Sequence, residues 1–209
     1  MFRKQKVMLI QNALSQEMAN FLTLYFRTKE AAGTTLKKTG YVPPQALEWG
    51  THEDAQVPGS FSIYGDQAGD TVLQLLQPIT EKATQLKLLP TYSYCRVYKK
   101  GAVLAKHKDR FSCDISTTLC LGGDPWAFCY KVGNKNKHIT LKPGEMIAYL
   151  GADVHHWREP FEGEECVQLF LHYNSVKSKF AEQNKYDGRP HLGLPSYFTK
   201  PINKKGEPT

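Results

Sequence analysis

Three residues with metal-binding side chains could act together in this chain. His107 and Asp109 are separated by one residue, and the pair His155-His156 follows later. Residues i and i+2 of a strand share a face, so one strand end can direct an imidazole and a carboxylate at the same ion. A histidine from a second strand would complete two nitrogens and one oxygen, a set that leaves open positions on the metal. Because the short motif is common by chance, its flanking residues decide the interpretation.

Length and composition are those of an ordinary globular protein. The 209 residues are 41% hydrophobic and 22% charged, which favours one domain over residues 1–209. No apolar run reaches the roughly 18 residues that cross a membrane. The basic start of the chain precedes only a short apolar run, so we expect no signal peptide. These features predict a cytoplasmic protein without membrane association.

Charge and cysteine content limit the partners and the compartment. The net charge of +7 could indicate an acidic partner such as nucleic acid, but the lysines are spread along the chain. We therefore favour a solvated lysine-rich surface. The 5 cysteines form no CxxC pair, which argues against a disulfide framework and a structural zinc site. Reduced cysteines fit the cytoplasm.

Periodicity predicts helices first and strands later. One helix should begin after Ser15 and end at Gly33, and a second should begin at Asp70. Residues 33–60 have no clear period and should form a loop or irregular strands. Short strands with turn residues between them follow Pro90 and predict an antiparallel sandwich or barrel. The expected strands are 92–98, 102–107, 115–121, 126–131, 137–141, 145–150 and 165–173.

The expected fold is mainly β (α+β), with two or more helices packed on one sheet. We predict helical and irregular support in residues 1–90 and a β core with the metal site in residues 91–174. Residues 175–209 are a C-terminal extension, expected to be extended with a frayed end at 204–209. The irregular segments 33–60 and 186–201 could cover a substrate or only the sheet edges.

The order of motifs around the histidines resembles the 2-oxoglutarate/Fe(II)-dependent dioxygenases, most closely their prolyl 4-hydroxylase-like branch. The resemblance covers about residues 90–173 and rests on Tyr98, Gly101, His107-Lys108-Asp109, Pro143-Gly144, His156, Pro160 and Gly163. It implies a double-stranded β-helix, or jelly-roll, core. It also implies Fe(II), 2-oxoglutarate and O2, with ascorbate as an accessory reductant. The implied reaction hydroxylates an unactivated C–H bond, with a peptidyl proline as one candidate, and releases succinate and CO2.

The resemblance assigns roles to individual residues. His107 and Asp109 match the first two iron ligands. The third ligand of the family stands four residues before a proline, which selects His156 over His155. Tyr98 matches the tyrosine that hydrogen-bonds 2-oxoglutarate.

One position departs from the family pattern. The Arg or Lys that pairs with the far carboxylate of 2-oxoglutarate is replaced here by Cys166. A buried dicarboxylate without a cation would be costly, so another group must serve. The candidates are Arg158, Arg96 and Arg110, and Gln168 shares the strand face of Cys166. We prefer Arg158 together with Gln168.

The substrate is less constrained than the metal site. Arg110, Trp157 and His155 are candidate substrate contacts. A protein or peptide and a small molecule both remain possible substrates, and the sequence predicts no oligomeric state. Two alternatives differ in class: a cupin-like barrel that binds a metal or small molecule without oxygenase activity, and an oxidative nucleic-acid demethylase.

Overall fold

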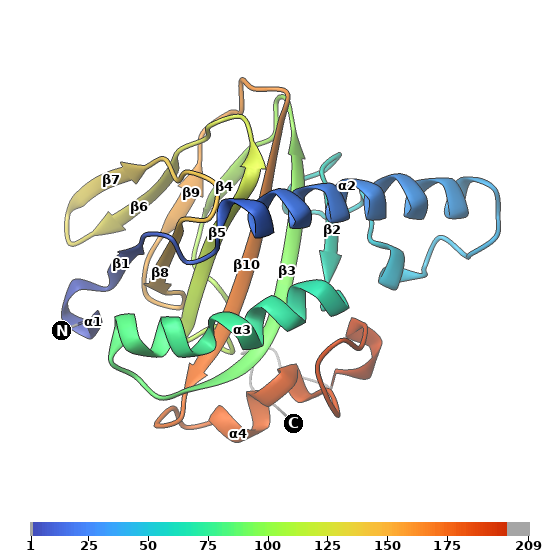
Figure 1. Ribbon diagram of the computed structural model, residues 1–209. Helices are drawn as coiled ribbons and strands as arrows, with labels where there is room; N and C mark the ends of the chain where they lie inside the picture. The colour runs from blue at the N-terminus through green and yellow to red at the C-terminus, as the bar shows by residue number, and fades with distance from the viewer. Residues whose placement is uncertain (1, 200–209) are drawn as a thin grey trace.

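The computed structural model describes residues 2–199 and contains two antiparallel sheets (Figure 1). In spatial order, the larger sheet consists of β1 (Val7–Ile10), β8 (Met146–Leu150), β5 (Ile115–Gly123), β10 (Glu165–Ser175), β3 (Leu88–Lys99) and β2 (Phe61–Tyr64). The smaller sheet consists of β4 (Leu104–His107), β9 (His156–Arg158), β6 (Phe128–Val132) and β7 (Lys135–Ile139). The helices are α1 (Phe2–Gln5), α2 (Gln16–Lys38), α3 (Gln67–Thr84) and α4 (Ala181–Asn184), with 3-10 turns η1 (Leu47–Trp49), η2 (Lys185–Gly188) and η3 (Ser196–Phe198).

The strands expected after Pro90 are present, with shifted bounds. β3 already begins at Leu88, and β7 begins at Lys135 rather than at residue 137. The short strand β9 was not predicted, because three residues give too little alternation to recognise. The mainly antiparallel fold with supporting helices is confirmed. β1 and β2 come from residues 1–90, so this segment also supplies two edge strands of the larger sheet.

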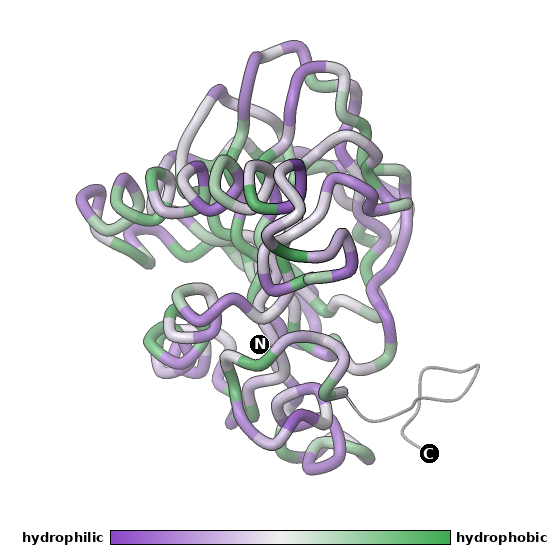
Figure 2. Tube along the Cα trace, turned by 90° about the vertical axis from the view of Figure 1, so that its right-hand side faces the viewer, coloured by the Kyte–Doolittle hydropathy of each residue, from purple (hydrophilic) through white to green (hydrophobic). Residues whose placement is uncertain are grey.

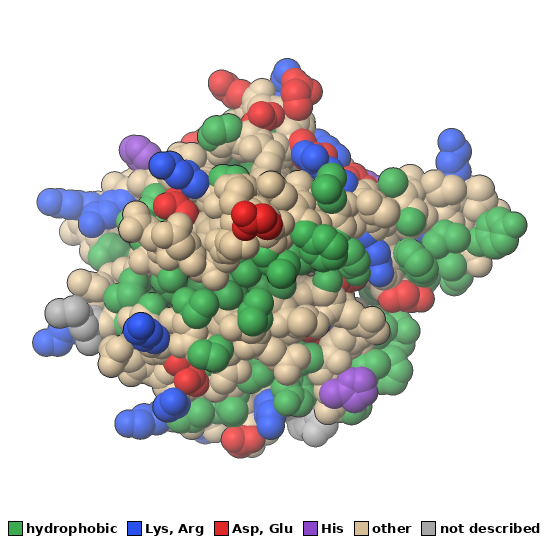
Figure 3. Space-filling view, viewed as in Figure 1, with side chains coloured by type: hydrophobic (Ala, Val, Ile, Leu, Met, Phe, Trp, Pro, Cys, Tyr) green, Lys and Arg blue, Asp and Glu red, His purple; other side chains and the backbone are tan. Residues whose placement is uncertain are grey.

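Both long helices pack on the larger sheet, as expected. Figures 1 and 2 show α2 and α3 as a layer on one side of the strands. α2 contacts β5 and β3, whereas α3 contacts β3 and β10. Their buried side chains join the main core, which the strands of the larger sheet complete. Apolar side chains also gather in a band on the outward face of these helices (Figure 3), from Met18, Phe21, Leu24, Leu75 and Ile79.

The first long helix begins where expected but does not end at Gly33. The Ser15 hydroxyl oxygen caps α2 by accepting a hydrogen bond from the backbone N–H of Met18 at 3.3 Å. The helix continues to Lys38, so the predicted stop is wrong. Gly33 lies against the backbone of Trp49, where any Cβ would overlap the carbonyl oxygen. The glycine therefore permits a close approach rather than a helix end.

The second long helix begins earlier than expected. Asp66, not Asp70, caps α3 by accepting a hydrogen bond from the backbone N–H of Ala68 at 2.9 Å. Asp70 is instead buried in the first turn, where it accepts hydrogen bonds from the backbone and hydroxyl of Ser93. Its carboxylate links the helix to β3, a tertiary role that has no local sequence pattern.

The C-terminal segment is folded against the body of the protein up to residue 199. Arg189 is buried, and its guanidinium lies 3.0 Å from the Asp70 carboxylate. The expectation of an extended tail is therefore wrong for residues 181–198, because a buried ion pair anchors them. The frayed end expected at 204–209 lies outside the described residues. Within residues 2–199, no helix combines the length and apolar character needed to cross a membrane.

Candidate metal centre and adjoining cavity

Two neighbouring strands of the smaller sheet bring the predicted metal-binding residues together. His107 ends β4 and pairs in register with His156, the first residue of β9. Asp109 follows β4, and its Oδ1 lies 3.7 Å from Nε2 of His107 and 3.4 Å from Nε2 of His156. One donor atom from each of the three residues falls within 4.8 Å of the others. The arrangement can hold a metal ion with two nitrogens and one oxygen.

Backbone carbonyls orient both imidazole rings. Nδ1 of His107 lies 2.8 Å from the carbonyl oxygen of Ala105, and Nδ1 of His156 lies 3.0 Å from that of Val154. A carbonyl can only accept, so each Nδ1 carries the proton. The Nε2 lone pairs are thus left free beside Asp109, the tautomer that metal ligation requires. The sequence could not identify these two acceptors.

The Asp109 carboxylate is held by residues of the larger sheet. The hydroxyl of Ser116 donates to Oδ2 of Asp109 and lies 3.0 Å from Nδ1 of His172. Burial alone would raise the pKa of Asp109, but its contacts with the imidazoles of His107 and His156 outweigh this effect and hold the pKa well below its usual range. Burial also lowers the pKa of His172 to about 4. Asp109 is therefore kept as a carboxylate next to a neutral histidine.

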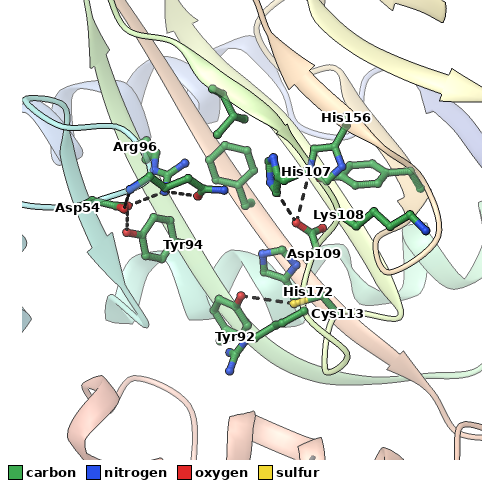
Figure 4. Close-up of a pocket in the computed structure, with 15 residues that line it drawn as sticks. Asp54, Tyr92, Tyr94, Arg96, His107, Lys108, Asp109, Cys113, His156 and His172 are labelled. Atoms are coloured by element: carbon green, nitrogen blue, oxygen red, sulfur yellow. Dashed lines mark hydrogen bonds and ion pairs between the residues drawn. The ribbon is translucent and has the colours of Figure 1, made fainter. Parts of the chain in front are cut away.

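A cavity of about 320 Å³ lies between the two sheets and opens beside these residues (Figure 4). Its walls are Asp54, Gln56, Tyr92, Tyr94, Arg96, Leu104, His107, Lys108, Asp109, Arg110, Cys113, Tyr149, His156, Phe170 and His172. In Figure 4 the Asp109 cluster stands on one side and Arg96 with Asp54 on the other. The cavity thus has charged groups at both ends. Its size is at the lower end of the range for small-molecule sites.

Arg158 lies two residues beyond His156 on the same strand face and is 1% exposed. Its guanidinium donates to the carbonyl of Trp126 at 2.7 Å and to Oε1 of Gln168 at 3.2 Å, while Nε has no partner. Within residues 2–199 it forms no ion pair with a carboxylate. A buried cation without a counter-ion is costly, so this position suits an anionic ligand.

Tyr98 carries a second incomplete polar group, and Trp126 connects its ring with Arg158. The Tyr98 side chain is fully buried, and its hydroxyl has no hydrogen-bond partner. The rings of Tyr98 and Trp126 meet edge to face at 4.9 Å, and the Arg158 guanidinium lies 5.0 Å from the Trp126 ring. Leu104 and Phe170 pack in the same apolar cluster and also line the cavity. They connect the cavity wall with the surroundings of Tyr98.

The other two candidate cations already have carboxylate partners. Arg96 donates to Asp54, and Arg110 lies 2.6 Å from Asp187. Of the three arginines proposed for the far carboxylate, Arg158 alone lacks an acidic partner among residues 2–199. Cys166 lies beside the cluster, where its sulfur accepts a hydrogen bond from Gln168 at 3.2 Å.

The remaining predicted contacts lie farther out. His155 is exposed, and its carbonyl accepts a hydrogen bond from Lys131 at 2.9 Å. Trp157 points away from the cavity, since its neighbours His156 and Arg158 point inward. Its indole donates to Glu159 at 2.7 Å. Neither side chain lines the cavity.

Several residues in and around the cavity were not among the predicted site residues. Ser116 and His172 are two of them, and both support Asp109. The shared face of Gln168 and His172 was visible in the strand pattern and is the signal that could have placed His172 at the site. Tyr149, whose hydroxyl is 3.4 Å from Nε2 of His156, and Asp54 reach the cavity only through tertiary pairing.

Comparisons with known proteins identify the fold. No protein-family model and no curated protein matches the sequence. The structure resembles a Pseudomonas putida prolyl-4-hydroxylase, with 15% identity over 83% of this chain and 95% of that chain and a TM-score of 0.59. It also resembles HygX from Streptomyces hygroscopicus, solved with nickel and 2-oxoglutarate bound (12% identity, 84% and 85% covered, TM-score 0.58).

A third similar structure is the viral collagen prolyl hydroxylase of Paramecium Bursaria Chlorella virus-1 in its 2-oxoglutarate complex. It shares 14% identity over 82% of this chain and 97% of that chain, with a TM-score of 0.53. The chain therefore has the fold of 2-oxoglutarate/Fe(II) oxygenases. This finding confirms, at the level of the fold, the resemblance seen in the motifs.

Proposed function

We propose that the protein is an Fe(II)- and 2-oxoglutarate-dependent oxygenase that hydroxylates an unactivated C–H bond and releases succinate and CO2. The observation that carries this proposal is the His107, Asp109 and His156 cluster, which lies near a buried arginine without a counter-ion. The shared fold supports the proposal. In this interpretation the two sheets form a double-stranded β-helix core.

His107, Asp109 and His156 would hold the iron. Their donor set fits a six-coordinate Fe(II) with open positions, and both imidazoles already present Nε2 to the Asp109 carboxylate. When bound, Fe(II) would supply activation of O2, with ascorbate as an accessory reductant. The protein keeps Asp109 ionised, fixes both rings through backbone carbonyls and surrounds the centre with aromatic side chains.

Arg158, Gln168 and Tyr98 would hold the far carboxylate of 2-oxoglutarate. Nε of Arg158 and the hydroxyl of Tyr98 are buried donors without partners, and a carboxylate would supply the missing acceptors. Gln168 would keep the guanidinium in place through its hydrogen bond. Two strand residues span about 6.6 Å, so Arg158 is within reach of a short dicarboxylate that also contacts the metal beside His156.

The substrate would enter through the open side of the cavity. A peptidyl proline is one candidate, because two similar structures are prolyl hydroxylases. A small molecule is another, because HygX has been solved with hygromycin B bound. Arg110, Trp157 and His155 are proposed as outer contacts, and we propose a cytoplasmic location.

Anaerobic titration with Fe(II) and 2-oxoglutarate tests this function. We expect a weak visible metal-to-ligand charge-transfer band in the wild type, which His107→Ala should abolish. His155→Ala is the matched control, because it removes an exposed histidine next to the cluster and should keep the band. A band absent from the wild type, or retained in His107→Ala, would contradict the proposal. Metal binding without the band would favour a cupin-like metal-binding barrel.

A further inference from the structure

We propose that Arg96 binds a carboxylate group of the substrate, so that the substrate is a small carboxylic acid whose other end reaches the metal centre. The inference rests on the proposed oxygenase function and specifies its substrate class. It concerns the cavity wall opposite Asp109, where Arg96 and Asp54 face the metal-binding cluster (Figure 4).

Arg96 belongs to a preformed anion site rather than to the surface. It lies within β3, between Ser62 of β2 and Gln168 of β10, and is 5% exposed. Its guanidinium carbon lies 5.1 Å from the ring of Tyr94 and 6.0 Å from the ring of Tyr98. These aromatic neighbours restrict the guanidinium while leaving it in the cavity wall.

The hydrogen bonds of Arg96 are incomplete. Its Nη2 atom donates both to the Asp54 carboxylate and to Oε1 of Gln56, the latter at 2.6 Å. Nε is buried and has no partner. A guanidinium has five N–H donors and no acceptor, so its unpaired N–H groups need a hydrogen-bond acceptor. A carboxylate of the substrate would supply that acceptor.

Asp54 shows that the site around Arg96 accommodates a carboxylate. Its side chain is a carboxylate that binds Arg96 and also accepts a hydrogen bond from the Tyr94 hydroxyl at 2.6 Å. Asp54 belongs to a loop and not to the sheet. The loop is closed at its base by the hydrogen bond from Gly59 N–H to the carbonyl of His52 at 3.1 Å. A substrate carboxylate would take the position that Asp54 holds in the resting protein.

The location of Arg96 distinguishes it from Arg158. Both arginines are buried, but Arg96 lines the open cavity and Arg158 does not. The two arginines would then bind different acids: Arg158 would bind 2-oxoglutarate, and Arg96 would bind the substrate. The cavity volume of about 320 Å³ is sufficient for a molecule of amino-acid size.

Ligand-observed saturation-transfer NMR on the full chain tests the proposal. The probes are the free amino acids, short mono- and dicarboxylic acids and the primary amide of each. Samples contain Zn(II) and saturating 2-oxoglutarate, which fills its own site, and a second set contains neither. We expect at least one acid to bind about tenfold or more tightly than its amide. Equal binding of acids and amides, or binding of no acid, would overturn the proposal.

Two variants with opposite expected effects sharpen the test. Arg96→Gln should lower the affinity for the acid to that for its amide. Asp54→Asn should raise the affinity for the acid by about 3- to 10-fold, because the competing internal carboxylate is removed. Arg27→Gln, which removes an arginine on α2, is the charge-matched control and should leave the affinity for the acid unchanged. Unfolding curves establish that each variant is folded, and an unchanged affinity in both Arg96→Gln and Asp54→Asn would contradict the proposal.

The same samples separate this proposal from the oxygenase function. If Arg96→Gln loses 2-oxoglutarate and Arg158→Gln retains it, Arg96 is the co-substrate cation and the substrate proposal is wrong, while the oxygenase function stands. If the wild type shows no charge-transfer band with Fe(II) and 2-oxoglutarate, the oxygenase function fails whatever the acids do.

Discussion

Two buried arginines in this protein differ in whether a carboxylate of the protein pairs with them. Arg189 is 3% exposed and forms an ion pair with Asp70, which fastens the C-terminal segment to α3. Arg158 is 1% exposed and has no carboxylate partner within residues 2–199. The first site is complete without a ligand. The second would gain a counter-ion on binding an anion, as we propose for 2-oxoglutarate.

The unsatisfied polar atoms follow the same division. Among the described residues, buried side-chain atoms without partners occur on Arg96, Tyr98, Ser112 and Arg158. Three of these four belong to the proposed binding sites: Arg96 lines the cavity, and Tyr98 and Arg158 both contact Trp126. Around Arg189, by contrast, backbone carbonyls of Tyr186, Leu194 and Thr91 complete the hydrogen bonds.

The largest effect on stability is expected at the completed site. Arg189→Gln leaves Asp70 buried without its counter-ion, and breaking such a pair costs about 3–5 kcal/mol. Urea unfolding should show this loss, while 2-oxoglutarate affinity stays within about twofold of the wild type. If Arg189→Gln were as stable as the wild type, the claim that the Arg189–Asp70 ion pair stabilises the fold would be wrong.

Arg158→Gln should instead lower the affinity for 2-oxoglutarate and leave stability nearly unchanged. Loss of a charged partner from a buried carboxylate costs about 2–5 kcal/mol, so 2-oxoglutarate should bind on the order of 100-fold more weakly or worse. The free energy of unfolding should change little, because the removed charge had no counter-ion. Titration of the charge-transfer band and urea unfolding of the same sample measure both quantities. A large stability loss with normal 2-oxoglutarate affinity would reverse the assignment.

A buried histidine in the cavity should make the metal-free protein sensitive to acid. The pKa of His172 falls from 6.5 in the unfolded chain to about 4 in the folded protein, because burial disfavours its charged form. The unfolded chain then binds more protons below pH 6.5, so stability is full above that pH and is lost as the pH falls toward 4. The loss approaches about 3 kcal/mol. Urea unfolding from pH 7 to 4 should show this slope, and His172→Gln should flatten it.

The smallest effect concerns the support of Asp109. Ser116→Ala removes the hydroxyl that donates to its Oδ2 atom, and such losses typically weaken metal binding by about tenfold. Thr117→Ser on the same strand is a mild control, because its hydroxyl bonds the Leu171 carbonyl instead. Isothermal titration with Fe(II) or Mn(II) would measure the difference. An unchanged affinity would show that Ser116 does not orient the carboxylate.

Most of the β core could be predicted because its residues have local patterns. Runs such as 115–121 and 165–173, rich in β-branched and aromatic residues and bounded by turn residues, predicted the strands of the larger sheet, and Ser15 predicted the start of α2. The end of α2 could not be predicted, since Gly33 responds to Trp49 and not to its own neighbours. Arg189 likewise anchors the C-terminal segment through a distant aspartate.

The candidate site shows the same limit. The spacing of His107 and Asp109 and the position of His156 were visible in the sequence, and the structure brings the three together. The state of each arginine was not visible, because Asp54, Asp70 and Asp187 reach their partners across long stretches of chain. Ser116 and Tyr149 join the site through strand pairing, which a single sequence does not reveal.

A crystal structure of the protein with Mn(II) and 2-oxoglutarate, grown without oxygen, tests the central claim most directly. The account predicts a metal about 2.2 Å from Nε2 of His107 and His156 and from the Asp109 carboxylate. It also predicts that the far carboxylate of 2-oxoglutarate contacts Arg158 and Tyr98. A metal bound elsewhere, or a 2-oxoglutarate whose far carboxylate lies on Arg96 while Arg158 stays without a counter-ion, would contradict it.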